Sequence, residues 1–230
     1  MFTQMILTGL AGMIIFVKWE NHIKYPIFDV SLFKSNRVFA LSNLAALIHY
    51  SATFAVTFLL SLYLQYIKLF DPQITGIILM SQPIMMALFS SFAGKLSDRI
   101  EPRIIATIGM SITCSMLLVL SFIQEVTSLA YVISCLLLMG VGCALFSSPN
   151  MNIIMSSVEK KSLSMAAAIV AELRSIGMVV SLTIISIFLS IYVGQMELNT
   201  QNAQSYLKAM HLSIISFTLR KFSSKDVLNE

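Results

Sequence analysis

The sequence predicts an all-α integral membrane protein, built from helices that cross a lipid bilayer about seven times. Hydrophobic residues make up 57% of the chain and charged residues only 11%, whereas soluble domains carry roughly 25% charged residues. With a mean hydropathy of +0.84, the chain lacks the polar side chains that a water-soluble fold of this length needs on its surface. The apolar residues form long continuous runs, which is not the period-two alternation of a membrane β-barrel.

The first apolar run, residues 2–17, is followed by a polar connection at residues 18–37. No basic segment precedes this run, so we do not expect a cleaved signal peptide. A bilayer span needs roughly 20 residues at 1.5 Å each, so the run is slightly short and is expected to be part of a longer helix. We therefore interpret residues 1–37 as a partial transmembrane helix with a cytoplasmic linker, and residues 38–230 as a C-terminal bundle of six helices.

Five long apolar runs and one short run make up the rest of the chain. They cover residues 38–66, 74–93, 104–123, 129–156 and 164–193, and about 11 residues between Lys208 and Arg220. Asp71 and Pro72 break the chain after the first of them, and Gln124 and Glu125 separate the third from the fourth. Gly140, Gly142 and Pro149 in the fourth run are interpreted as helix-packing and kink residues. The last run is marginal for a full crossing.

The basic residues predict the orientation of the chain. Alternate connections carry twelve lysines and arginines, whereas the opposite connections carry only Lys68 and Lys208. Because cytoplasmic loops are the ones enriched in Lys and Arg, we expect a multi-pass cell-membrane protein with its N-terminus outside and its C-terminus in the cytoplasm. A nucleic-acid-binding patch would not alternate in step with hydropathy, so no nucleic acid partner is expected, and the lipid bilayer is the expected surrounding.

The most charged connection, residues 94–103, joins two spans on the cytoplasmic side. Its glycine, Gly94, allows two helix ends to approach, and Asp98 can cap or neutralise the positive end of the following helix. Arg99 and Arg103 can bond carbonyls at the end of a neighbouring helix. Such contacts can form in one conformation and break in another, which predicts a gating latch. The alternative is a tight loop whose charges only set the orientation.

The same connection resembles the G-x-L-x-D-R-x-G-x-R loop motif of the major facilitator superfamily, in its second-half copy. The matching residues are Gly94, Leu96, Asp98, Arg99 and Arg103. Residues 26–39 (PIFDVSLFKSNRVF) with Asn43, and residues 172–177 (ELRSIG), resemble fourteen-span drug:proton antiporters of the EmrB/QacA type. Glu101 stands where the motif has glycine, which puts in doubt the tight turn that a glycine would allow.

The resemblance implies only the C-terminal half of such a transporter, namely part of one central helix and the following six-helix bundle. It also implies a bacterial cell membrane, a missing N-terminal half as a partner, and export of lipophilic, cationic small molecules against proton entry. The proton gradient would be the energy source, and no cofactor is expected.

Glu172 and Arg174 lie within the span at residues 164–193. An ionisable group at this depth costs at least about 2.5 kcal/mol unless it faces protein or water. The two are two residues apart and project to nearly opposite sides of a helix, so they do not pair with each other. We assign Arg174 to the bundle interior or substrate cavity and Glu172 to proton coupling. The alternative for each is a structural charge satisfied by a neighbouring helix.

Three further polar residues in the span at 38–66 are candidates for the substrate or proton pathway. Asn43 and Tyr50 share a helix face at a spacing of seven residues, and His49 is a candidate proton carrier. Hydrogen bonding between helices is the alternative for all three.

Other classes of function are disfavoured or left open. The chain has no P-loop, no nucleophile elbow and no metal-ligand cluster, so we expect neither an enzyme nor a metal site. The leading prediction is a multidrug or small-molecule efflux antiporter. The alternatives are a truncated membrane fragment that does not transport, and a half-transporter that pairs with a separate N-terminal half.

Overall fold

A computed structural model describes residues 33, 36–192, 207, 210–218 and 221 of the chain. Five helical segments within this part are long and apolar enough to cross a membrane. They confirm the five long spans expected from hydropathy. The first expected run, at residues 2–17, lies outside the described residues. Of the last run, residues 210–218 are helical.

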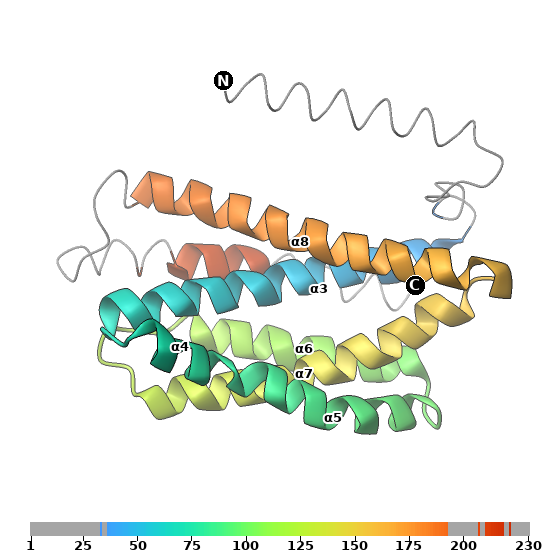
Figure 1. Ribbon diagram of the computed structural model, residues 1–230, viewed down its shortest axis with the longest axis horizontal. Coiled ribbons are helices and arrows are strands. Elements are labelled where there is room, and N and C mark those ends of the chain that lie inside the picture. Colours follow the sequence, from blue (N-terminus) through green and yellow to red (C-terminus); the bar gives the residue numbers. More distant parts are fainter. Residues whose placement is uncertain (1–32, 34–35, 193–206, 208–209, 219–220, 222–230) are drawn as a thin grey trace, which may run out of the picture.

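The helices are arranged side by side along the long axis of the molecule (Figure 1). They are α3 (Arg37–Leu62), continued by the π-helical turn η1 (Tyr63–Ile67), then α4 (Pro72–Leu79), α5 (Ser81–Ser97), α6 (Pro102–Leu120), α7 (Leu129–Ser156), the short 3-10 turn η2 (Lys160–Ser162) and α8 (Leu163–Tyr192). The first of them begins one residue after Asn36, whose side-chain Oδ1 accepts a hydrogen bond of 3.0 Å from the backbone N–H of Phe39. That bond satisfies one of the unpaired donors at the helix start.

The run expected at residues 74–93 is a broken helix that extends to Ser97. The break lies at Met80, between α4 and α5. Pro83 explains it, because proline has no N–H to donate to the carbonyl of Leu79 and its ring crowds that carbonyl. The far end extends past the apolar residues because the hydroxyl of Ser97 donates to the carbonyl of Gly94 at 2.8 Å, and the backbone N–H of Asp98 bonds the same carbonyl.

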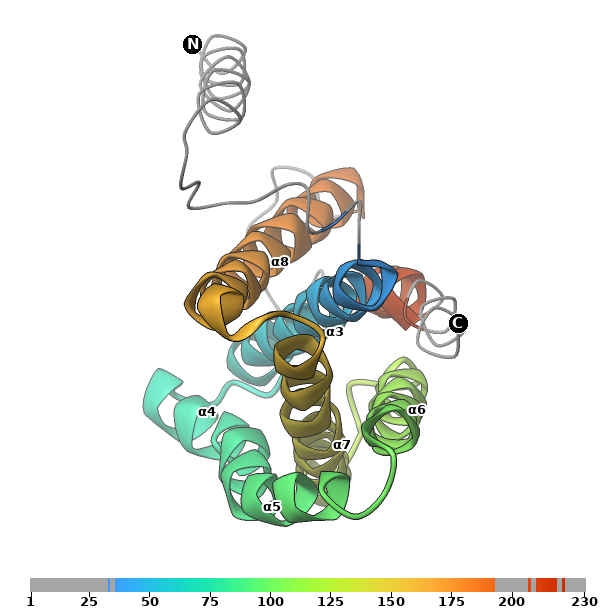
Figure 2. The ribbon, with the colours of Figure 1, turned by 90° about the vertical axis from the view of Figure 1, so that its right-hand side faces the viewer.

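Helix α7 lies at the centre of the bundle. It packs against α5, α6 and α3, and α8 packs on the other side of α3. The end-on view shows α5, α7, α3 and α8 following one another across the molecule, with α6 beside α7 and the helix at residues 210–218 beside α3 (Figure 2). Within an apolar 18-residue stretch of each span, 50% is buried in the spans at Arg37–Ile67 and Leu129–Ser156, but only 17% in those at Pro72–Ser97 and Lys160–Ile191. The outermost helices therefore leave most of their apolar surface uncovered.

Small residues set the close contacts of α7, as expected for Gly140 and Gly142. A Cβ added at Gly140 would lie 2.4 Å from the backbone oxygen of Gln82 on α5, and one added at Gly142 would lie 3.0 Å from the backbone oxygen of Gly109 on α6. Only glycine permits backbones to approach this closely. Through these contacts α7 is fixed against both neighbours.

Candidate functional site

A polar cavity of about 190 Å³ lies where α3, α5, α7 and α8 meet. All four helices contribute to its wall, which consists of Tyr50, Ser90, Ser147, Ser148, Asn150, Met151, Val170 and Arg174. At 1.5 Å per residue, Tyr50 lies about 20 Å from the start of α3 and Arg174 about 16 Å from the start of α8. The cavity is therefore well inside the apolar spans.

Tyr50 and Arg174 make the strongest polar contact in this cavity. The guanidinium Nη2 of Arg174 donates to the hydroxyl of Tyr50 at 2.9 Å, and its central carbon lies 4.4 Å from the centre of the tyrosine ring. A guanidinium over an aromatic face is attracted by the ring quadrupole, more strongly where water is scarce. This contact partly compensates a positive charge held at depth and joins α8 to α3. Arg174 is itself exposed in the described part of the chain, so it lines the cavity from its open side. Its assignment to the substrate pathway stays a prediction.

Serines line the opposite wall, where α5 crosses α7. The hydroxyls of Ser90 and Ser148 lie 3.4 Å apart, and the hydroxyl of Tyr50 reaches that of Ser147 at 3.5 Å. Hydroxyls both donate and accept hydrogen bonds and can rotate to suit a ligand. The serine wall can therefore bind both hydrogen-bond donors and hydrogen-bond acceptors of a neutral ligand. Arg174 can only donate, so it binds acceptors alone.

These serines were not singled out from the sequence. The available signal is the run of small polar residues at 147, 148 and 150 in an otherwise apolar span. Such residues are also common at helix contacts within membranes, so only the tertiary structure distinguishes a cavity wall from a packing seam.

Asn43 and His49 lie outside this cavity, in the buried packing around α3. The side-chain Nδ2 of Asn43 donates to the backbone oxygen of Phe39 at 2.8 Å, and the ring of His49 stacks on Phe146 with centroids 4.1 Å apart. Among the described residues, Oδ1 of Asn43 and Nδ1 of His49 have no hydrogen-bond partner. The structure therefore brings together Tyr50 and Arg174 but not Asn43 or His49.

Glu172 faces away from the cavity. It lies two residues before Arg174, about 200° around the helix, and its side chain is exposed. Ala168, Ser175 and Val179 on the same stripe are also exposed. The described part of the chain therefore leaves this face of α8 uncovered, with Glu172 at its middle.

The loop residues lie at another level of the bundle, where α5 ends and α6 begins. Gly94 is half-buried near Ser148 of α7, and Asp98 and Arg99 are exposed in the turn. Arg103 is half-buried in the first turn of α6. A hydrogen bond of 2.7 Å from the amide of Asn152 to the hydroxyl of Ser97 ties α7 to this end of α5.

Within the described residues, no group of three or more His, Cys, Asp or Glu side chains is placed to hold a metal ion. The chemistry available in the cavity is hydrogen bonding, positive charge and an aromatic face. Such a set binds and orients a molecule, and it offers no activated nucleophile.

Comparison with known proteins decides the family. The sequence profile of the Major Facilitator Superfamily matches residues 42–198. This range contains four whole spans and most of a fifth. The chain belongs to the Major Facilitator Superfamily. It is 29% identical over 204 residues to the riboflavin transporter RibZ of Clostridioides difficile. It is also 27% identical over 190 residues to the multidrug resistance protein Stp of Mycobacterium tuberculosis.

The two alignments cover 87% and 83% of this chain but only 44% and 35% of those relatives. The chain therefore spans less than half the length of these superfamily members. Both relatives are described as transport or resistance proteins, not as enzymes. The superfamily predicted from the loop at residues 94–103 is confirmed, and so is an all-α membrane fold. The narrower assignment to fourteen-span antiporters stays a prediction.

Proposed function

We propose that this chain forms the C-terminal half of a small-molecule exporter, and that the cavity at Tyr50 and Arg174 is its share of the substrate pathway. The observation that carries this proposal is the convergence of four helices on one polar, positively charged cavity within apolar spans. Intramembrane arginines are costly and are retained chiefly where they act on a substrate or ion. Superfamily transporters bind substrate near the midplane and rock two bundles around it.

The proposed substrates are lipophilic small molecules of the kind exported by multidrug transporters. Hydrogen-bond acceptors of the substrate would bind Arg174, and hydroxyl or amide groups would bind the serines. A cationic substrate would be repelled by Arg174 at this depth, so its charge has to lie away from the guanidinium. Glu172 is the sole carboxylate within the five described spans.

The missing half is part of the proposal. The exposed stripe of α8 around Glu172 and the weakly buried α5 suit packing against a first-half bundle, which would also shield Glu172 from lipid. Proton entry through Glu172 would then supply the energy, with the N-terminus outside and the C-terminus in the cytoplasm. Two alternatives are consistent with a chain that covers less than half of its relatives' length. One is a fragment that does not transport, and the other is a half-transporter that pairs with a separately encoded partner.

The function is tested by expressing the chain alone and together with a first-half bundle, in bacteria that lack their own exporters. We expect tolerance to lipophilic drugs only when both halves are present, and we expect it to disappear when a protonophore collapses the proton gradient. Tolerance that survives the protonophore would contradict proton coupling, and no tolerance in either case would favour the fragment.

In the same cells, Glu172→Gln removes the titratable group and keeps the shape of the side chain. Export should become insensitive to external pH and slow at every pH, because the carrier of the proton is gone. Glu159→Gln, in an exposed loop where the carboxylate pairs only with Lys161, is the matched control and should export normally. Unaltered pH dependence in Glu172→Gln would remove this residue from the coupling role.

The loop at residues 94–103 is proposed to act as a latch between transport conformations. Asp98→Asn should slow export several-fold in the paired transporter, since the amide lacks the negative charge that would bind a positive partner in one of the two conformations. Lys95→Gln, a charge change at the same end of α5 but outside the motif, should have little effect. Equal export kinetics in vesicles for Asp98→Asn and the unchanged protein would refute the latch.

A further inference from the structure

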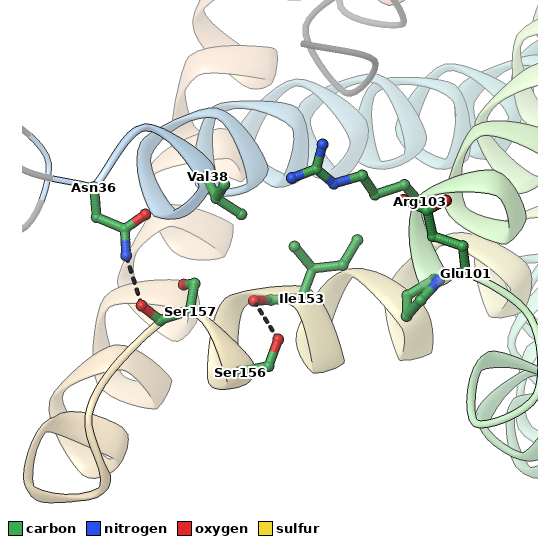
Figure 3. A pocket seen from close by; sticks show the side chains of 8 residues that line it. Asn36, Val38, Glu101, Arg103, Ile153, Ser156 and Ser157 are labelled. Atoms are coloured by element: carbon green, nitrogen blue, oxygen red, sulfur yellow. Dashed lines mark hydrogen bonds between the residues drawn. The ribbon is translucent and has the colours of Figure 1, made fainter.

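A second cavity, open and about 440 Å³ in volume, lies at the end of the bundle that carries the charged loop. It is formed by the start of α3, the start of α6 and the end of α7, and its walls consist of Asn36, Val38, Glu101, Pro102, Arg103, Ile153, Ser156 and Ser157. Figure 3 shows Arg103 extending from α6 over Ile153 toward α3. The volume of this second cavity falls within the roughly 300–1,000 Å³ of typical small-molecule sites.

The position of this cavity places it at the height of lipid headgroups. Helix α6 has 19 residues, which is about 28 Å of helix and close to the roughly 30 Å of a bilayer's hydrocarbon core. Glu101 and Arg103 flank the first residue of that helix, so they lie where the span leaves the hydrocarbon. Val38 and Ile153 give the cavity an apolar side.

The polar uncharged groups of the wall already have partners. The amide Nδ2 of Asn36 donates to the backbone oxygen of Ser157 at 2.6 Å. The hydroxyl of Ser156 donates to the backbone oxygen of Ile153 at 3.1 Å, and that of Ser157 to Ile154 at 2.8 Å. Figure 3 shows the first two of these bonds as dashed lines. The charged side chains are thus the strongest groups that the wall offers to a ligand.

Those charged groups are one guanidinium and one carboxylate. Arg103 is half-buried and Glu101 is exposed. In the described part of the chain neither makes an ion pair, the one pair there being Lys161 with Glu159 at 2.8 Å. Arginine binds phosphate through two parallel hydrogen bonds, and a carboxylate binds an ammonium group. A free phosphate ion would satisfy Arg103 but would be repelled by Glu101.

We propose that this cavity binds the headgroup of a zwitterionic phospholipid of the phosphoethanolamine class, with the phosphate on Arg103 and the ammonium on Glu101. An anionic headgroup without an ammonium group, such as phosphoglycerol, would gain the first contact only. Glu101 stands where the loop motif has glycine, so the carboxylate is a feature of this chain's own sequence. The site does not depend on the proposed export function.

The test is native mass spectrometry of the purified 230-residue chain in detergent, with added phosphatidylethanolamine, phosphatidylglycerol or inorganic phosphate. We expect the unchanged chain to retain phosphatidylethanolamine about tenfold better than phosphatidylglycerol, as one charge-assisted contact implies. Arg103→Gln should lower retention of both lipids. Glu101→Gln should remove the preference and keep phosphatidylglycerol binding.

The matched controls are Arg99→Gln and Asp98→Asn, which change charges of the same loop that do not line the cavity. They should leave retention of both lipids unchanged, and circular dichroism should show the same helix content for all variants. Equal retention of phosphatidylethanolamine by Arg103→Gln and the unchanged chain would overturn the proposal. So would displacement of the lipid by inorganic phosphate, which would indicate a simple anion site, or a preference that survives Glu101→Gln.

Discussion

Gly109→Ala is expected to destabilise the bundle, because all three of the nearest atoms that an added Cβ would meet belong to the backbone of α7. An added Cβ would lie 2.6 Å from the backbone carbon of Leu145 and 2.6 Å from the backbone nitrogen of Phe146. Backbone atoms in the middle of a helix cannot rotate out of the way, so α6 must move off α7. Overpacking of this kind costs about 1–3 kcal/mol, and we expect a clear drop in the midpoint of thermal unfolding of the detergent-solubilised chain.

The effect should also reach the cavity, because α7 carries Ser147, Ser148 and Asn150 to its wall. Gly76→Ala on α4 is the matched control, since no atom lies within 4 Å of an added Cβ there and alanine is the better helix former by up to about 1 kcal/mol. Its unfolding midpoint should be equal or higher. Equal midpoints for Gly109→Ala and the unchanged chain would show that α6 and α7 do not pack through this glycine.

Arg174→Gln should lower export by the paired transporter by roughly 10- to 100-fold. Hydrogen bonds to charged groups contribute about 1.5–3 kcal/mol, and about 1.4 kcal/mol corresponds to a factor of ten. Glutamine keeps a polar group in the cavity but loses the positive charge and the contact with the face of Tyr50. The measurement is the initial rate of dye export from energised vesicles at equal amounts of folded protein.

Two variants separate the parts of that contact. Arg174→Lys keeps the charge but not the planar group over the ring, and Tyr50→Phe keeps the ring but not the hydroxyl that accepts the 2.9 Å bond. Both should fall between the unchanged protein and Arg174→Gln. Export by Arg174→Gln at the rate of the unchanged protein would exclude the guanidinium from the substrate pathway.

Hydropathy predicts the five described spans well because the bilayer imposes one length and one polarity on every crossing segment. It places their ends less well. The break at Met80 follows from the missing N–H of Pro83, and α5 continues to Ser97 because Ser97 itself supplies a hydrogen bond at that end. Both features depend on individual hydrogen bonds, to which average hydrophobicity is insensitive.

The candidate site was predictable only in part. The spacing of Glu172 and Arg174 already requires opposite helix faces. In the structure both side chains are exposed, but only Arg174 lines the cavity with Tyr50. Tyr50 as the partner of Arg174 was not predictable, since the two lie 124 residues apart in the chain. Asn43 and His49 are as polar as Tyr50 in the sequence, yet both are buried elsewhere.

By itself, the sequence determined that this protein is a bundle of bilayer-spanning helices and which segments cross, because that depends on the free energy of moving each segment from water into lipid. It also determined the family, through the charged loop at residues 94–103. Only the tertiary structure decided which polar side chains meet, because the glycine contacts of α7 fix how the helices are rotated and how closely they approach. That rotation brings Tyr50, Ser147 and Arg174, which lie on three different helices, to one cavity.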